Sequence, residues 1–154
     1  MTETKCPQLH FAFEASLRVG TPRTTETSGI TRRVIPILDG RFEGAGLKGI
    51  VLRGGADWQV IRPDGTTEVD ARYDLQTDDG SVISVENRGL RRGSAAVLQE
   101  LLAGEVVEPS TYYFRTAAFF RTAASSLRWL SESVFVGDGE RYPHLVVIRF
   151  WRVG

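Results

Sequence analysis

The stretch from Gly54 to Gly89 constrains the fold most. It places strand-like runs next to tight turns in the order GGADWQVIRPDGTTEVDARYDLQTDDGSVISVENRG. The turns are Gly-Gly, Pro-Asp-Gly and Asp-Asp-Gly, and short turns of this kind join antiparallel neighbours. The runs themselves carry Asp, Arg, Trp, Tyr and Asn. A meander with charged and aromatic residues inside its strands is typical of a sheet that rolls into a barrel with a usable interior.

Strand patterns also dominate the rest of the chain. Apolar and polar residues alternate along the whole of Leu9 to Val19, which predicts a strand with one apolar face. Further strands are expected at 30–38, 47–53, 57–62, 67–77, 82–87, 111–116, 127–136 and 145–153. The segment 21–29 is expected to be an extended loop, 39–40 and 136–139 are expected to be turns, and 42–46 is expected to be irregular.

One segment has the spacing of a helix. Its apolar residues, from Val97 to Leu102, fall on one face, Ser94 stands where an N-cap belongs, and Gly104 follows its end. Eight or more short strands with one helix favour closure, because an open sheet of that size would expose two unpaired edges. We therefore expect an all-β fold, a single antiparallel β-barrel of about eight to ten strands. It occupies 9–154 after a flexible tail at 1–8, and its first strand pairs with its last.

Length and charge narrow the functional classes. The 154 residues suit one domain, and nineteen basic and nineteen acidic residues leave no net charge to attract nucleic acid or an anionic membrane. No glycine-rich phosphate motif precedes a helix, which argues against nucleotides. The chain starts without the pattern of a signal peptide, and no apolar run approaches the ~20 residues of a membrane helix. We expect a cytoplasmic protein that binds neither nucleic acid nor membrane.

The chain is poor in metal ligands and in catalytic nucleophiles. Cys6 is the one cysteine and lies in the polar tail, so neither an internal disulfide nor a multi-thiolate site can form. The two histidines, His10 and His144, are expected at the surface, and a histidine-based zinc or iron site commonly takes two or three imidazoles. Asp78-Asp79-Gly80 reads better as a turn than as a cation loop. The sequence therefore predicts no metal and no cofactor.

Several separated segments resemble one protein family. They are GRFEG at 40–44, GGADWQVIRPDG at 54–65, DARYDLQTDDG at 70–80, YYFRT at 112–116, WL at 129–130 and VFVGDGER at 134–141. In this order they are similar to the DUF3237 (UPF0311) family, and the likeness extends from about residue 9 to residue 153. The resemblance implies a small barrel of the lipocalin-like or calycin-like class. It implies no generally assigned activity and offers no established catalytic residues to transfer.

Polar side chains inside apolar strands are the candidates for function. They are Asp57, Asp70, Arg72, Asn87 and Arg115. Within 67–77, alternation puts Asp70 and Arg72 on one face and Tyr73 on the other. If the charged face meets water, which is the more ordinary arrangement, Tyr73 helps to fill the barrel. If it faces the lumen, aspartate and arginine must pair to offset desolvation and can orient a polar ligand.

Aromatic residues are numerous enough to line a cavity for a flat ring. The set comprises Trp58, Tyr112, Tyr113, Phe114, Phe119, Phe120, Trp129, Phe135, Phe150 and Trp151. Ordinary core packing is the better explanation for any single one of them, because aromatic side chains fill barrel interiors with or without a ligand. The residues singled out as substrate contacts are Trp58, Asp70, Asn87, Tyr113 and Trp129.

Two functional hypotheses follow. The first is a cofactor-independent isomerase, lyase, dehydratase or cyclase that acts on an aromatic or polyketide-like metabolite in the lumen. In it Asp57 is a general base with a pKa raised by burial, and Arg72 or Arg115 stabilises a developing enolate or phenolate. Trp58 stacks on the ring. The second hypothesis is a non-catalytic carrier or sensor of a small hydrophobic ligand. The sequence leaves open the substrate and whether two barrels form a homodimer.

Overall fold

The structure is a computed structural model, and it describes residues 2–154. Ten strands occur in these residues: β1 (Leu9–Val19), β2 (Arg23–Thr27), β3 (Ile30–Gly44), β4 (Leu47–Val51), β5 (Gly55–Ile61), β6 (Thr67–Thr77), β7 (Val82–Gly93), β8 (Tyr112–Thr122), β9 (Val134–Tyr142) and β10 (Leu145–Val153). The helices are α1 (Ala95–Leu102) and α2 (Arg128–Ser131), with 3-10 turns at Pro109–Thr111 and Ser125–Leu127.

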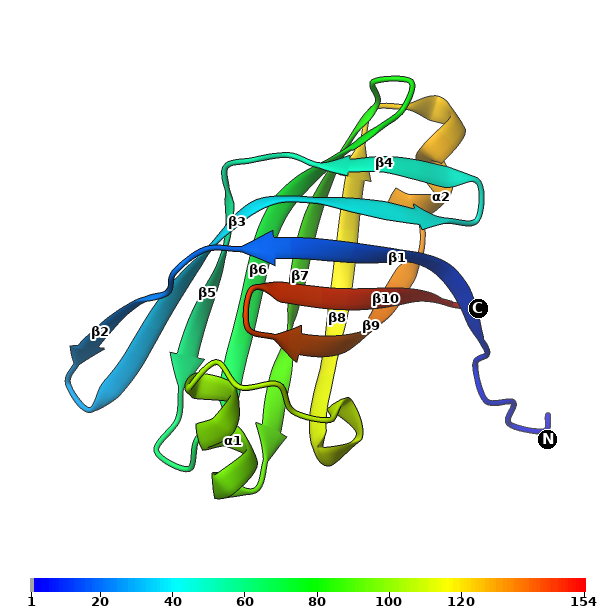
Figure 1. The fold of residues 1–154 in the computed structure, drawn as a ribbon. Coiled ribbons are helices and arrows are strands. Elements are labelled where there is room, and N and C mark those ends of the chain that lie inside the picture. Colours follow the sequence, from blue (N-terminus) through cyan, green and yellow to red (C-terminus); the bar gives the residue numbers. More distant parts are fainter. Residues whose placement is uncertain (1) are drawn as a thin grey trace.

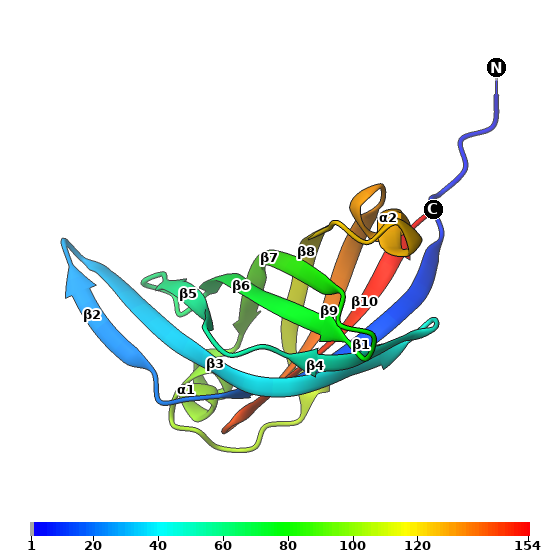
Figure 2. The same cartoon turned by 90° about the horizontal axis from the view of Figure 1, so that it is seen from above.

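The strands form a closed antiparallel barrel (Figures 1 and 2). Its order is β1-β10-β9-β8-β7-β6-β4-β3, and β3 pairs again with β1, which joins the two ends of the sheet. β5 shares the place of β4, because both strands pair with β3 on one side and with β6 on the other. Eight strand positions thus surround the interior in the described part of the chain, with two extra strands, and the expected all-β barrel is confirmed.

The first strand closes the barrel. β1 pairs antiparallel with β10 from one end to the other, with Leu9 opposite Val153. Its other edge pairs with β3. The predicted pairing of the first strand with the last is therefore confirmed. The bounds expected for the first and last strands, and for the strand at 67–77, are those observed.

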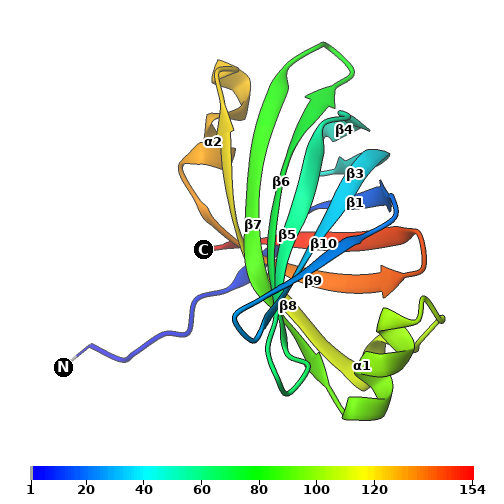
Figure 3. The same ribbon diagram turned by 90° about the vertical axis from the view of Figure 1, so that its left-hand side faces the viewer.

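The two halves of the interior differ in character. Near α2, Phe13 packs against Phe42, Phe120 and Phe150 with ring centroids 4.9 to 5.7 Å apart. Leu130 of α2 is fully buried and closes this end. α1 lies at the opposite end of the barrel (Figures 1 and 3). The half near α1 contains the polar side chains of the interior.

Several expected loops are strands. The segment 21–29 contains β2, whose five residues are all exposed and pair with β3 in a hairpin that projects from the barrel (Figure 2). The expected turn at 39–40 lies inside β3. There the register with β1 shifts, since Arg18 faces Asp39 and Val19 faces Ile37, so one extra residue of β3 makes a bulge. The segment expected to be irregular from 42 onward stays in β3 as far as Gly44.

The segment 127–139 differs most from expectation. It was expected to be a strand followed by a turn, but it contains α2 and then β9, which continues through Gly137 and Gly139. A Cβ at Gly137 would collide with the Thr116 hydroxyl, and one at Gly139 would collide with the Phe114 ring. These glycines therefore permit a close approach of β9 to β8 and do not mark a turn.

The aromatic half of the core predicts a contrast between two phenylalanines. Phe150→Ala should lower the free energy of unfolding by about 3–5 kcal/mol, because it leaves a cavity among buried rings. Phe119 is 54% exposed on β8, so Phe119→Ala should change the same quantity by about 0.5 kcal/mol or less. Urea denaturation measures both values. Equal losses would contradict the assignment of one ring to the core and the other to the surface.

Candidate functional site

Polar side chains gather around a cavity in the half of the barrel near α1, which we call the lumen site. They are Asp57 and Gln59 of β5, Asn87 and Arg91 of β7, Thr116 of β8 and Arg141 of β9. The apolar part of its lining is Leu17, Val19, Ile35, Ile37, Val69, Ala71, Phe114, Val146 and Ile148. The empty space, mouth included, is about 470 Å³. The cavity is narrow, and only a small part of this space is wide enough for a water molecule.

Strand alternation explains why these polar side chains meet. Every second residue of β7 points inward, so the buried series that begins with Ile83 reaches Asn87 and Arg91 towards α1. On β9 the inward series begins with Phe135 and ends with Arg141. The same strands thus supply apolar side chains to one half of the barrel and polar ones to the other.

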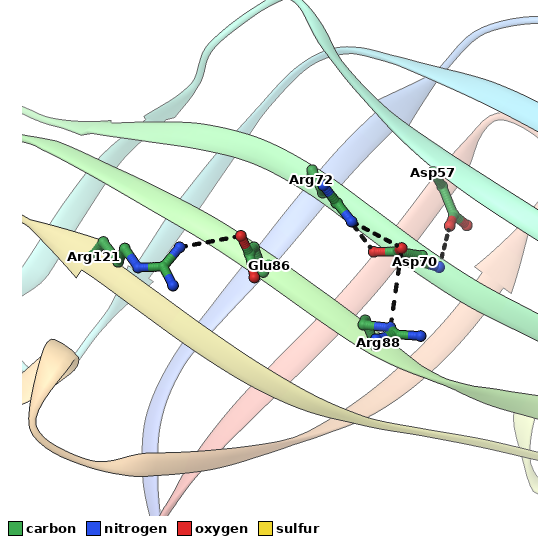
Figure 4. Close-up of polar contacts among 6 residues, drawn as sticks. All are labelled: Asp57, Asp70, Arg72, Glu86, Arg88 and Arg121. Atoms are coloured by element: carbon green, nitrogen blue, oxygen red, sulfur yellow. Dashed lines mark hydrogen bonds and ion pairs between the residues drawn. The ribbon is translucent and has the colours of Figure 1, made fainter.

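Asp57 is the one carboxylate in the lining of the lumen site. It accepts hydrogen bonds from Gln59 Nε2 at 2.7 Å and from the backbone N–H of Asp70 at 2.9 Å, the second drawn in Figure 4. Burial raises the pKa of Asp57, and this outweighs the two hydrogen bonds and the charges of Arg91 and Arg141, which lower it. Asp57 therefore takes up a proton at a pH where a surface aspartate is still ionised.

Gln59 is placed to serve both forms of this carboxyl group. Its amide nitrogen donates to Asp57, while its amide oxygen has no partner among residues 2–154. With the amide turned over, the oxygen would accept a hydrogen bond from the protonated carboxyl. Asp57 can therefore gain or lose a proton without losing this contact.

Two arginines face the same cavity without a carboxylate partner. Arg91 and Arg141 are 3% and 7% exposed, and neither forms an ion pair within the described chain. The Arg91 guanidinium lies 5.5 Å from the centre of the Phe114 ring. Burial lowers the pKa of Arg91 to about 10, with a further contribution from the charge of Arg141. Burial likewise lowers the pKa of Arg141.

Five buried polar atoms of the site, including the Gln59 amide oxygen, lack hydrogen-bond partners in the described part of the chain. Within residues 2–154 they are Gln59 Oε1, Asn87 Oδ1, Arg91 Nε, Thr116 Oγ1 and Arg141 Nη1. Buried polar atoms are almost always hydrogen-bonded, and each one left alone costs about 1–3 kcal/mol. These unpartnered atoms are concentrated around one cavity.

Two of the sequence-predicted site residues lie in the lumen site. Asp57 lines it as the functional hypothesis requires, and Asn87 is 3% exposed beside it. Both were predicted from their position as polar residues inside apolar strands. Their roles in binding or catalysis stay predictions.

Asp70 and Arg72 lie on the outer face of β6, which corrects the lumen-facing alternative. The Arg72 side chain is 59% exposed, and its guanidinium lies 3.3 Å from the Asp70 carboxylate, which Arg88 approaches to 4.0 Å (Figure 4). Tyr73, the next residue along β6, is buried instead. The more ordinary arrangement, with the charged row in water, is the one observed.

Trp58 and Tyr113 also point away from the lumen. They are 46% and 42% exposed, because each is the strand neighbour of an inward residue, Asp57 for Trp58 and Phe114 for Tyr113. Adjacent residues of one strand cannot share a face. The prediction that Trp58 stacks on a ring bound in the lumen is therefore wrong.

Arg115 and Trp129 lie outside the lumen site for different reasons. Arg115 is on the outer face of β8 and pairs with Asp138 at 2.9 Å. Trp129 belongs to α2, at the other end of the barrel, where its ring lies 6.1 Å from that of Phe135. Neither side chain reaches the cavity.

The sequence-based site lacks Gln59, Arg91, Thr116 and Arg141. Gln59 lies two positions after Asp57, so alternation alone would have placed it on the same face. Arg91 lies beyond the expected end of its strand at residue 87, and Arg141 lies beyond the expected turn at 136–139. Extending the alternation past those limits would have found both arginines.

Within residues 2–154, no group of three His, Cys, Asp or Glu side chains is arranged to hold a metal ion. Helices with the length and hydropathy needed to cross a membrane are absent from the same residues.

The family of the chain follows from sequence comparison. Residues 7–153 match the family described as "Protein of unknown function (DUF3237)". The chain belongs to this family. A UPF0311 protein of Rhodopseudomonas palustris (strain TIE-1) is 42% identical over 139 residues, which cover 90% of this chain and 91% of that one. A UPF0311 protein of Clostridium acetobutylicum is 38% identical over 122 residues, or 79% and 77% of the two chains.

Solved structures share the DUF3237 fold. The conserved protein of unknown function RPA1785 from Rhodopseudomonas palustris has a TM-score of 0.93 at 39% identity, over 99% of this chain and 100% of that one. A beta-barrel like protein from Acinetobacter baumannii AYE has a TM-score of 0.85 at 34% identity, over the whole of both chains. A protein described as an enzyme from Penicillium herquei has a TM-score of 0.75 at 22% identity, over 100% and 99% of the two chains, which shows the fold alone. The resemblance inferred from separated segments is confirmed.

The raised pKa of Asp57 predicts a pH-dependent difference in stability. Because its folded-state pKa lies above the ordinary 3.8, the folded protein holds this proton more tightly than the unfolded chain does. As the pH rises from about 4 through the folded-state pKa, the wild type should lose stability relative to Asp57→Asn, which cannot titrate. Urea denaturation of both proteins at a series of pH values measures the difference. A difference that stays constant or grows in favour of the wild type would show that the pKa is not raised.

Proposed function

We propose that the protein is a cofactor-independent enzyme that moves a proton on a small aromatic or polyketide-like metabolite in the lumen site, as an isomerase, lyase, dehydratase or cyclase. One observation carries the proposal. Asp57, a carboxyl group with a raised pKa, shares its cavity with two buried guanidinium groups, those of Arg91 and Arg141. Proton abstraction beside a carbonyl needs a base of this kind and cations to receive the charge that develops.

In the proposed reaction Asp57 takes a proton from a carbon or a hydroxyl group of the bound molecule. When the proton comes from a carbon beside a carbonyl group, the electron pair moves onto the carbonyl oxygen and forms an enolate. When it comes from a phenolic hydroxyl group, the pair stays on that oxygen and forms a phenolate. Arg91 and Arg141 donate hydrogen bonds to that oxygen, and their effect is strong because most of the surrounding wall is apolar.

In an isomerase or a cyclase, Asp57 then returns the proton to another atom of the same molecule. In a lyase or a dehydratase, the electron pair returns from the oxygen to form a double bond, the bond to the leaving group breaks, and Asp57 gives its proton to that group, which departs as water in a dehydration. In this proposal Arg91 and Arg141 take the roles predicted for Arg72 and Arg115.

The wall of the lumen site supports this chemistry. Apolar side chains such as Leu17, Ile35 and Val146 face the cavity, and they lower the polarity around the carboxyl group and the reacting atoms. A narrow apolar cavity also restricts the shapes of a flexible substrate, which by itself accelerates ring closure. A ring-sized ligand requires the lining side chains to part, since the space as it stands is small.

A carrier or sensor of a small ligand is the second candidate. The observation that favours it is the predominance of apolar side chains in the lining of the cavity. A carrier needs such a cavity and a few polar groups to orient the ligand, but it does not need a titrating carboxyl group. The two candidates therefore differ in what the loss of Asp57 does.

Hydrogen exchange at carbon tests the enzymatic proposal without knowledge of the natural substrate. The probe is 2-tetralone, an aromatic ketone with acidic C–H groups, incubated with the protein in D2O and followed by proton NMR. The wild type should accelerate exchange, and Asp57→Asn should lower the acceleration by about a hundred-fold or more, as loss of a general base does. Asp70→Asn, the same change on the outer face of β6, is the matched control and should keep the wild-type rate.

Two outcomes would count against the proposal. Exchange by Asp57→Asn at the wild-type rate would remove Asp57 from the base role. Saturable binding of 2-tetralone by a wild-type protein that leaves the exchange rate unchanged would favour the carrier.

A further inference from the structure

We infer that the lumen site binds a small organic carboxylate, with the carboxylate group held by Arg91 and Arg141 and its apolar remainder against the aliphatic wall. The inference rests on the proposed function in taking the same cavity as the ligand site. It goes further by naming the chemical class of the ligand.

The first argument is the balance of charge around the cavity. Arg33 of β3 lies level with Gln59 of β5, is partly buried, and its positive charge lowers the pKa of both Arg91 and Arg141. Three cations therefore act on one another inside this half of the barrel. Asp57 is the one carboxylate of residues 2–154 whose charge acts on both inner arginines. Buried cations in excess of their counter-charges are costly, and an anionic ligand would offset that cost.

The second argument is the supply of hydrogen-bond donors. Arg91 Nε and Arg141 Nη1 are buried and lack partners among the described residues. A guanidinium group presents its donors in a planar fork, which fits the two oxygens of a carboxylate. The hydroxyl of Thr116, which also lacks a partner in residues 2–154 and lines the same cavity, can donate to a bound oxygen as well.

The shape of the site selects a carboxylate over a phosphate. Aliphatic side chains, among them Val19, Ile37 and Ile148, supply most of the lining, so the ligand must be apolar apart from its charged group. The space is narrow, which suits a planar group better than a tetrahedral one. A phosphate would also bring up to two negative charges into the cavity that holds Asp57, whereas a carboxylate brings one.

Asp57→Asn is expected to have opposite effects on carboxylate binding and on the proposed proton transfer. Its carboxyl group lies in the same cavity as the two arginines, so its negative charge repels a bound carboxylate. Asp57→Asn removes this charge and keeps the size of the side chain. The variant should therefore bind a carboxylate more tightly, although it has lost the base needed for proton transfer.

Benzoate, benzamide and inorganic phosphate are the probes, titrated into the protein and followed by NMR or calorimetry. Benzamide has the shape of benzoate without its charge. The wild type should bind benzoate about ten-fold or more tightly than either other probe, the difference expected for hydrogen bonds to a charged group. Arg91→Met and Arg141→Met should each weaken benzoate binding by about ten-fold or more. Arg115→Met, the same change on the outer face of β8, is the control and should leave it unchanged.

The outcomes are separable from those of the exchange experiment. Equal affinity of the wild type for benzoate and benzamide would overturn the inference, and that comparison requires no variant to fold. Unchanged benzoate affinity in both methionine variants, or tighter binding of phosphate, would overturn it as well. Selective, arginine-dependent binding of benzoate, together with saturable binding of 2-tetralone that leaves its exchange rate unchanged, would keep the inference and reject the proposed enzyme. Exchange of 2-tetralone without tighter binding of benzoate than of benzamide would support the proposed enzyme and reject the inference.

Discussion

The pairing of β1 with strands on both of its edges is the contact on which the rest of the structure depends. β1 joins β10 on one side and β3 on the other, and this turns a long sheet into a closed wall. Closure gives the inward side chains an interior of low polarity. It is this interior that raises the pKa of Asp57 and lowers the pKa of Arg91, because burial penalises each charged form. The chemistry of the lumen site is therefore a consequence of how the barrel closes.

The sequence predicts the fold well wherever alternation is uninterrupted. Leu9–Val19, Thr67–Thr77 and Leu145–Val153 were found with the bounds that the structure has, because each keeps one apolar face along its length. Glycine is the reason that the prediction for β9 was wrong. The local sequence around Gly137 predicts a turn, but the absence of a side chain there lets β9 approach Thr116. A contact between two strands cannot be recognised from the sequence of one of them.

The site was predicted only in part, because alternation shows which residues share a face but not which face is inward. Asp70 and Arg72 lie on the opposite face of β6 from Tyr73, and both faces carry groups able to serve a ligand. The face of β6 that points into the barrel is decided by the pairing of β6 with β5 and β7, which places Ala71 beside Asp57 and Asn87. Such long-range pairing has no signature in a single strand.

The titration of Asp57 is the decisive experiment, since the proposed chemistry requires a carboxyl group held in an interior of low polarity. Carbon-13 NMR of the aspartate carboxyl groups follows each one separately. Asp39 is the internal reference, because its hydrogen bond and ion pair with Arg18 lower its pKa below 3.8. The account predicts that Asp57 titrates above 3.8 and well after Asp39 as the pH rises. Titration of Asp57 at or below the pH at which Asp39 titrates would contradict it.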